Sequence, residues 1–433
     1  MKSLHTKSLP FILLVGACTL FLGSSIGWTY PLNGYPDTGI LRLEGFRLAQ
    51  EGKVRGIRLY SGGLLQLEQV DLRLVDRQDD LIPAPDPEFT AQVQNLLGEE
   101  ADRYGVTVLD LSDPEKPLYA EHRADARANP GSVGKIVVAL GVFQALADIY
   151  PKDLQARLSI LGNTVVTADQ FIQADHHKVP FWTPDSKKIW YRPVQVGDQA
   201  NLWTYLDWML SASSNAAASM VMRELVLMTH FGRQYPVSVE TAERFFAETP
   251  RKELSTLFAR AIQDPIIRNG LDIERLRQGS FFTRKGKQLV PGTTSYASPR
   301  ALMQFLIKME QGKLVDAFSS REIKRLIYMT QGRIRYASSP ALGNSAVYFK
   351  SGSLYKCKAE EGFTCRKYHG NVVNMLNSVA VIESPAGQSK LHYMVVVMSN
   401  VLRKNSAVVH QTLATRLHRL IESNHRSRKS IEQ

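Results

Sequence analysis

Two kinds of binding site are missing from this sequence. Its formal net charge is +12 over 433 residues, yet the lysines and arginines are dispersed and form no basic stretch interleaved with aromatic residues. This argues against nucleic-acid binding, although a basic surface is compatible with an anionic lipid or an anionic cell-wall polymer. The adjacent His176 and His177 have no evident third ligand, and neighbouring side chains on a strand point apart. We therefore expect no metal and no other cofactor.

Cysteine is also scarce, with 3 residues in the whole chain. Cys18 lies in an N-terminal targeting segment over residues 1–24, where Lys2 and Lys7 precede a nearly unbroken apolar run at 9–23. The run is too short for a comfortable transmembrane helix. It predicts export to the periplasm, followed either by cleavage of the segment or by its retention as an anchor on the outer face of the cytoplasmic membrane.

The three cysteines have different expected fates. Residues 15–18 read VGAC, a loose lipobox that would place a lipid on Cys18, but the apolar run continues past this cysteine. If Cys18 leaves with the targeting segment or carries a lipid, Cys357 and Cys365 remain as an even pair. An exported chain reaches an oxidising compartment, so we expect these two to form a disulfide. The alternative is two unpaired thiols in a loop.

Composition and hydrophobic pattern divide the rest of the chain. Residues 25–78 are interpreted as a small β-unit, because the apolar residues between 39 and 75 alternate like about three short strands. Prolines and aspartates mark 79–85 as a linker. The remainder, 86–433, is interpreted as one large domain. Over the whole chain, 44% of residues are hydrophobic and 22% are charged, an ordinary globular balance.

Helix caps and periodicity predict the order of elements in the large domain. A hairpin followed by a buried helix, rather than repeated βαβ units, indicates an α+β fold. The predicted elements are a helix begun by Asp86-Pro87, a hairpin at 106–119, a helix after Ser132, helices at 202–227 and after Ser298-Pro299, strands at 346–350, 377–383 and 392–399, and a final helix at 410–422.

The most informative stretch is NPGSVGK at residues 129–135, which opens the buried helix. Ser132 and Lys135 are three residues apart, so they share one face near the N-terminus of that helix. A hydroxyl is a poor nucleophile until a base takes its proton. A lysine whose pKa is lowered by burial and by other cations can be that base. Taken alone, this S-x-x-K pattern is a weak signal, because it occurs by chance in most chains of this length and then marks a helix cap followed by a surface lysine.

Two further motifs follow in order. Residues 213–215 read SSN between two predicted helices, and residues 350–352 read KSG at the end of a predicted strand. Together with Ser132-x-x-Lys135, this set resembles the serine β-lactamase and penicillin-binding superfamily, and its class A branch in particular, over about residues 86–422. The resemblance implies an antiparallel sheet flanked by helices with an all-helical lobe across the cleft. It also implies β-lactams or acyl-D-Ala-D-Ala cell-wall peptides as substrates.

The resemblance assigns catalytic roles to three residues. Ser132 would attack a carbonyl and carry the acyl group, and Lys135 would be, or assist, its base. Ser213 would relay a proton toward the leaving nitrogen.

The resemblance also assigns substrate-binding roles. Asn215 would hydrogen-bond the substrate amide, while Lys350 would lower the pKa of Lys135 and, with Ser351, bind a substrate carboxylate. Gly352 and Ser353 continue this edge of the site, and the backbone N–H of Ser353 would form the oxyanion hole with that of Ser132.

One feature of class A β-lactamases is missing. Their E-x-x-L-N loop carries a glutamate that activates the deacylating water, but residues 276–284 read LRQGSFFTR and contain no acid. Asp272 and Glu274 lie nearby without the motif. The sequence therefore predicts an exported acyl-serine hydrolase that deacylates slowly, more like a D,D-peptidase. The alternatives are a β-lactamase with an unconventional base and a non-catalytic module that binds a cell-wall peptide or a protein.

Overall fold

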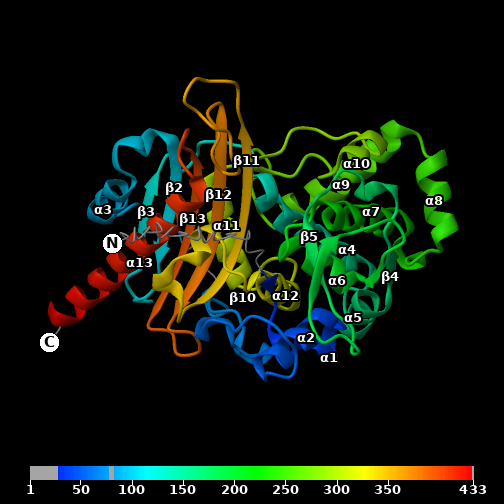
Figure 1. Cartoon of the computed structure of the whole chain (residues 1–433), viewed down its shortest axis with the longest axis horizontal. Helices are drawn as coiled ribbons and strands as arrows, with labels where there is room; N and C mark the ends of the chain where they lie inside the picture. Colours follow the sequence, from blue (N-terminus) through cyan, green and yellow to red (C-terminus); the bar gives the residue numbers. More distant parts are fainter. Residues whose placement is uncertain (1–27, 78–81, 432–433) are drawn as a thin grey trace, which may run out of the picture.

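The computed structural model describes residues 28–77 and 82–431 (Figure 1). The targeting segment and Cys18 lie outside these residues, so export, cleavage and lipidation stay predictions. Within the described residues, the centre of one half of the molecule is a five-stranded antiparallel sheet in the order β11-β12-β13-β2-β3. β2 (Tyr104–Asp110) and β3 (Leu118–His122) form the predicted hairpin. β11 (Ala346–Lys356), β12 (Val373–Ser384) and β13 (Leu391–Asn400) are the predicted C-terminal strands.

Helices cover both faces of this sheet. α3 (Pro87–Leu97) and α13 (Ser406–Ile431) pack on one face, and α11 (Pro299–Glu310) and α12 (Ala317–Ile327) on the other (Figure 1). The predicted caps are present, because the Asp86 carboxylate accepts a hydrogen bond from a backbone N–H of the first turn of α3, and the hydroxyl of Ser298 does the same in α11. The mixed α+β fold is confirmed.

The other half is a helical lobe built around α4 (Lys135–Ile149), which follows the short 3-10 turn η5 (Gly131–Gly134). α4 is buried on nearly all sides by α6, α7 and α9, as its continuous apolar sequence predicts. Ser132 therefore stands at the base of a helix that packing holds in place. The lobe helices are α5 (Leu154–Asn163), α6 (Leu202–Leu210), α7 (Asn215–Phe231), α8 (Val239–Glu248), α9 (Arg251–Arg268) and α10 (Arg284–Leu289).

The strands predicted at residues 39–75 are wrong. α2 (Leu41–Gln50) occupies the first part, and the 3-10 turns η2 (Ser61–Gly63) and η3 (Leu67–Gln69) interrupt an irregular path through the rest. The alternation is one of burial alone, because side chains and isolated backbone groups, rather than a partner strand, bond the backbone here. The hydroxyl of Tyr328, for example, bonds both the Gly62 carbonyl at 2.9 Å and the Leu65 N–H at 3.0 Å.

This N-terminal segment packs on the same hydrophobic cluster as the helical lobe. Arg42 of α2 donates through Nε to Asp207 of α6 at 2.6 Å, and both side chains are buried. The segment also contributes β1 (Trp28–Thr29), which pairs with β10 (Met329–Gln331). The domain limits at 78 and 85 stay predictions.

The insertion at 162–200 packs its aromatic side chains, as predicted. β4 (Val165–Thr167) pairs with β7 (Gln199–Asn201), and β5 (Lys178–Phe181) pairs with β6 (Trp190–Pro193). The ring of Phe181 stacks on that of Trp190 at 6.1 Å and also contacts Trp208 of α6 at 5.2 Å. The insertion is thereby fastened to the helical lobe, beside the second motif.

Candidate active site

The Ser132 turn lies against the edge strand of the sheet. Gly131 has φ +54°, and a Cβ on Gly352 would stand 2.4 Å from the backbone N of Ser132 and 2.5 Å from the Pro130 carbonyl. Only glycine allows β11 to run this close to the turn. A Cβ on Gly131 would in turn lie 3.4 Å from the backbone N of Ser353. The two N–H groups expected to form an oxyanion hole are therefore carried by adjacent pieces of backbone.

Lys135 is at the centre of the polar contacts. Its Nζ lies 3.1 Å from the Ser132 Oγ, 2.8 Å from the Asn215 Oδ1 and 2.5 Å from the Ser213 carbonyl oxygen. Its side chain is fully buried. Because a lysine amine has only three hydrogen-bonding directions, these contacts aim one of them at the nucleophile.

Burial lowers the pKa of Lys135 to about 7. The Asp175 carboxylate acts in the opposite direction, and the Arg335 guanidinium adds to the lowering. Burial also lowers the pKa of Lys350 well below its ordinary value, followed by repulsion from Lys135 and then from Arg335. Burial therefore lowers the pKa of Lys135, as expected from the sequence. The repulsion between the two lysines lowers mainly the pKa of Lys350.

Ser213 lies between the two lysines. Its Oγ is 2.9 Å from the Lys350 Nζ and 3.5 Å from the Lys135 Nζ. Its backbone has φ 58°, a left-handed conformation that is rare for a residue with a side chain and is typically held at functional sites. Ser214 caps α7 immediately afterwards, with its Oγ accepting from the Ala217 N–H at 3.1 Å. The cap and the turn together fix Ser213 between the amines.

Arg335 is a site residue that the sequence reasoning missed. It begins η8 (Arg335–Ser338), also with a left-handed φ of 53°. Its guanidinium donates to the Ser351 Oγ at 2.6 Å, the Ser353 Oγ at 3.2 Å and the Tyr368 hydroxyl at 2.9 Å. Burial would raise the pKa of Tyr368, but Arg335, followed by Lys367, outweighs this and lowers it. No motif surrounds Arg335, so only the folded chain reveals its position.

The predicted disulfide is present and adjoins the site. Cys357 and Cys365 are bonded, with their Cα atoms 6.0 Å apart, in the segment that links β11 to β12. Lys367 and Tyr368 follow this loop and line the cavity next to Ser132.

The loop at 276–284 meets the site with uncharged groups. The Phe282 ring faces the Lys135 Nζ at 4.8 Å from its centroid. Gln278 is buried, with its amide oxygen against Gly134, and it donates through Nε2 to the Ser280 carbonyl at 2.6 Å. Glu274 is exposed. The loop therefore presents a ring to the lysine and an amide to the turn that carries Ser132.

A cavity of about 180 Å³ opens beside Ser132. The second and third motifs contribute most of the motif residues that line this cavity. It is lined by Ser132, Ser213, Asn215, Lys350, Ser351 and Ser353, together with His177, Leu210, Ser211, Ala212, Met329, Ile334, Arg335, Phe349, Lys367 and Tyr368. Lys135 lies beneath it.

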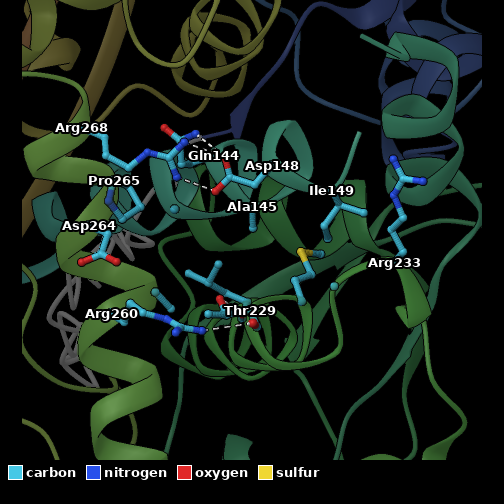
Figure 2. Close-up of a pocket in the computed structure, with 15 residues that line it drawn as sticks. Gln144, Ala145, Asp148, Ile149, Thr229, Arg233, Arg260, Asp264, Pro265 and Arg268 are labelled. Carbon is cyan, nitrogen blue, oxygen red and sulfur yellow. Dashed lines mark hydrogen bonds and ion pairs between the residues drawn. The ribbon is translucent and has the colours of Figure 1, made fainter. Parts of the chain in front are cut away.

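A larger cavity of about 370 Å³ lies elsewhere, among α4, α7 and α9 (Figure 2). Figure 2 shows two of its charged side chains with partners, since Arg268 pairs with Asp148 at 2.6 Å and Arg260 reaches the Thr229 carbonyl at 3.5 Å. No residue of the three motifs lines it. The volume of a cavity therefore does not identify the active site, and the smaller cavity beside Ser132 is the candidate. Among the residues that the structure describes, no group of His, Cys, Asp and Glu side chains could hold a metal ion.

The fold and the three motifs define a protein of the serine β-lactamase and penicillin-binding superfamily. The model of the Beta-lactamase enzyme family matches residues 88–419, and the chain belongs to that family.

Similar solved structures include two β-lactamases and a penicillin-binding protein. A mutant of PBP-A, solved as an acyl-enzyme complex with penicillin G, has a TM-score of 0.47 and 13% identity, covering 78% of this chain and 98% of that one. The TLA-3 extended-spectrum β-lactamase has a TM-score of 0.49 and 13% identity, covering 77% and 98%. A β-lactamase from Chitinophaga pinensis has a TM-score of 0.46 and 16% identity, covering 76% and 97%. A comparison with curated proteins finds no match.

Proposed function

We propose that this protein is an acyl-serine hydrolase in which Ser132 forms an acyl-enzyme with β-lactams or with acyl-D-Ala-D-Ala peptides. The observation that carries the proposal is the Lys135 Nζ, which lies 3.1 Å from the Ser132 Oγ, on a lysine whose pKa is lowered by burial to about 7. A neutral amine in that position can take the hydroxyl proton. The Ser132 Oγ then attacks the substrate carbonyl, and the N–H groups of Ser132 and Ser353 stabilise the oxyanion.

Departure of the leaving group uses the other side of the cavity. Ser213 contacts both amines, so its hydroxyl can give a proton to the leaving nitrogen and regain one from Lys135 or Lys350. The carboxylate of the substrate would lie against Ser351 and Arg335. An anion there would also raise the pKa of Lys350 and restore its charge.

We further propose that acyl-enzymes formed by β-lactams persist. Ester hydrolysis requires a water molecule and a positioned base, and Phe282 and Gln278 occupy the loop where class A β-lactamases carry a carboxylate. The runner-up, a β-lactamase with an unconventional base, would need another group to reach that water.

Incubation with a fluorescent penicillin, followed by mass spectrometry, tests the proposal. We expect an adduct on Ser132 that persists for minutes, and none in Ser132→Ala. Nitrocefin turnover at tens per second would instead establish a β-lactamase. The absence of any adduct on the folded protein would favour a non-catalytic binding module.

We also propose that the chain is exported and works in the periplasm or anchored to the outer face of the cytoplasmic membrane. The targeting segment and the Cys357–Cys365 disulfide support this. Cell fractionation of the tagged protein tests it, and a purely cytoplasmic distribution would contradict it.

A further inference from the structure

The insertion at 162–200 brings an unassigned Asp–His pair to the active site. Asp175 has only 4% of its side chain exposed, and its Oδ1 lies 2.6 Å from the Nδ1 of His177. Its Oδ2 accepts from the Ser214 hydroxyl at 3.0 Å and from the Ala216 N–H at 2.9 Å. The carboxylate is therefore fixed to the residues that flank Asn215 in the second motif.

This environment keeps Asp175 ionised. Burial would raise the pKa of Asp175, but the hydrogen bonds from His177 and from the Ala216 N–H, together with the charge of Lys135, lower it below its ordinary value. An ionised carboxylate on Nδ1 makes that nitrogen the hydrogen-bond donor. Neutral His177 then has the tautomer in which Nε2 can accept a proton.

His177 faces the part of the site that the leaving group would vacate. Its side chain is 44% exposed, and it lines the cavity that Ser213, Lys350 and Arg335 also line. Phe282 and Gln278 do not line this cavity. His177 therefore shares this cavity with Ser132, whereas the two residues of the loop at 276–284 do not.

We propose that His177, oriented by Asp175, is the base that hydrolyses acyl-enzymes whose leaving group has departed. This inference rests on the proposed function, namely acylation of Ser132. In the step, a water oxygen bonds to the ester carbonyl carbon while its proton passes to the His177 Nε2. The resulting tetrahedral intermediate then breaks its bond to the Ser132 Oγ, which takes a proton back, and the free acid leaves.

The inference names a substrate class. A linear amide, ester or thioester releases its leaving group, and water can then enter the space beside Ser213 and His177. A β-lactam differs because its leaving nitrogen stays covalently tethered to the acyl group after the ring opens. The tethered group fills that space and separates His177 from the ester. Persistent penicillin adducts and turnover of linear substrates are thus compatible in one site.

The test compares His177→Gln with the matched control His176→Gln, which changes the neighbouring exposed histidine outside the cavity. With a linear acyl thioester, His177→Gln should lower kcat by roughly 10²–10⁴-fold, the usual range for loss of a general base. The rate of Ser132 acylation should stay within about threefold, so acyl-enzyme should accumulate and be visible by mass spectrometry. The control should behave as the unsubstituted protein does.

Asp175 is a positioning residue, and Asp175→Asn provides its own readout. We expect kcat for the thioester to fall and acyl-enzyme to accumulate, while the pH dependence of penicillin labelling moves to lower pH, because Asp175 raises the pKa of Lys135. A merely unfolded or distorted site would instead lose penicillin labelling at every pH. The lifetime of the penicillin adduct should be the same in all three variants.

Other outcomes overturn the inference. Slower acylation in His177→Gln would place the histidine on the leaving-group step, and a change in KM alone would make it a substrate-binding group. If penicillin labels Ser132 in every variant but His177→Gln hydrolyses the thioester normally, only this inference fails. If penicillin fails to label Ser132 in the unsubstituted protein, the proposed function fails.

Discussion

The protonation state of Lys135 controls the first step of the proposed reaction. Its pKa of about 7 lies far below the ordinary lysine value of 10.5, with burial as the main cause. The acylation rate should therefore rise with pH through about 7, as the amine loses its proton and can act as a base. Stopped-flow measurement of penicillin acylation from pH 5 to 9 checks this. A rate that is flat across the range would remove Lys135 from the role.

The same lowered pKa affects stability with a defined sign. Between pH 7 and pH 10 the unfolded chain holds a proton on Lys135 that the folded chain has released. The contribution of this group to the free energy of unfolding therefore rises with pH in that window.

Substituting Lys135 separates charge from basicity. Lys135→Arg keeps a cation but cannot accept the Ser132 proton, since arginine does not deprotonate in proteins. We expect acylation to slow by roughly 10²–10⁴-fold, with penicillin adduct formation followed over time. Acylation at the original rate would assign the base to another group. Circular dichroism serves as the folding control.

At the scale of elements, the loop at 276–284 accounts for the proposed persistence of penicillin adducts. Gln278 is buried against Gly134, so Gln278→Glu would introduce a carboxylate of nearly the same shape beside the Ser132 turn. We expect the penicillin adduct to decay at least tenfold faster, given the 10²–10⁴-fold effect of a well-placed base. An unchanged adduct lifetime in a folded Gln278→Glu protein would show that the water approaches from elsewhere. Gln288→Glu, in the neighbouring α10, is a suitable control for the added charge.

The disulfide element stabilises one rim of the cavity. Cys357 and Cys365 close a short loop that leads directly to Lys367 and Tyr368. Removing such a bridge typically costs about 2–3 kcal/mol in the free energy of unfolding. Denaturant melts of the protein and of its Cys357→Ser/Cys365→Ser double variant measure this. The same double variant should acylate more slowly, because Tyr368 helps to hold Arg335.

The sequence could predict those features that depend only on residues close to one another along the chain. The Ser132, Ser213 and Lys350 motifs and the capped helices could be located, because each depends on neighbours within one turn or one strand. Arg335 could not, since it reaches Ser351 through a left-handed backbone conformation that no pattern marks. The sequence offers His177 only as a metal ligand without partners. Its place in the site depends on Asp175, which bonds both His177 and Ser214, and Ser214 is distant in sequence.

The error at residues 39–75 has a related cause. Alternating burial predicts a strand only when a second strand supplies backbone hydrogen bonds. Here the Lys324 Nζ bonds the Asp71 carbonyl at 2.6 Å and the Arg325 guanidinium bonds the Leu67 carbonyl at 2.9 Å. Those partners come from α12, which lies far along the chain, so the pattern alone could not distinguish the two arrangements.

At the scale of the whole molecule, the N-terminal segment joins the two halves. Arg42 pairs with Asp207 in the helical lobe, while Arg73 donates to Glu383 in the sheet at 3.1 Å. Arg42→Ala would leave Asp207 buried and unpaired, so we expect a loss of about 3–5 kcal/mol in the free energy of unfolding. Urea denaturation measures it. Arg47→Ala, which removes two ion pairs at an exposed position of the same helix, should cost less than about 1 kcal/mol per pair.

The partners of this segment also determine when it can fold relative to the rest of the chain. Tyr30 donates to Glu322 at 2.8 Å, and Arg42 and Arg73 bond Asp207 and Glu383, so the residues made first depend on residues made much later. Contacts of such long range form late, because much of the chain must be collapsed before their ends can meet. The N-terminal segment is therefore among the last parts of the chain to attach to the folded protein. A polypeptide cut short before Asp207 would lack all three of these partners, so its beginning would stay unattached and open to proteases.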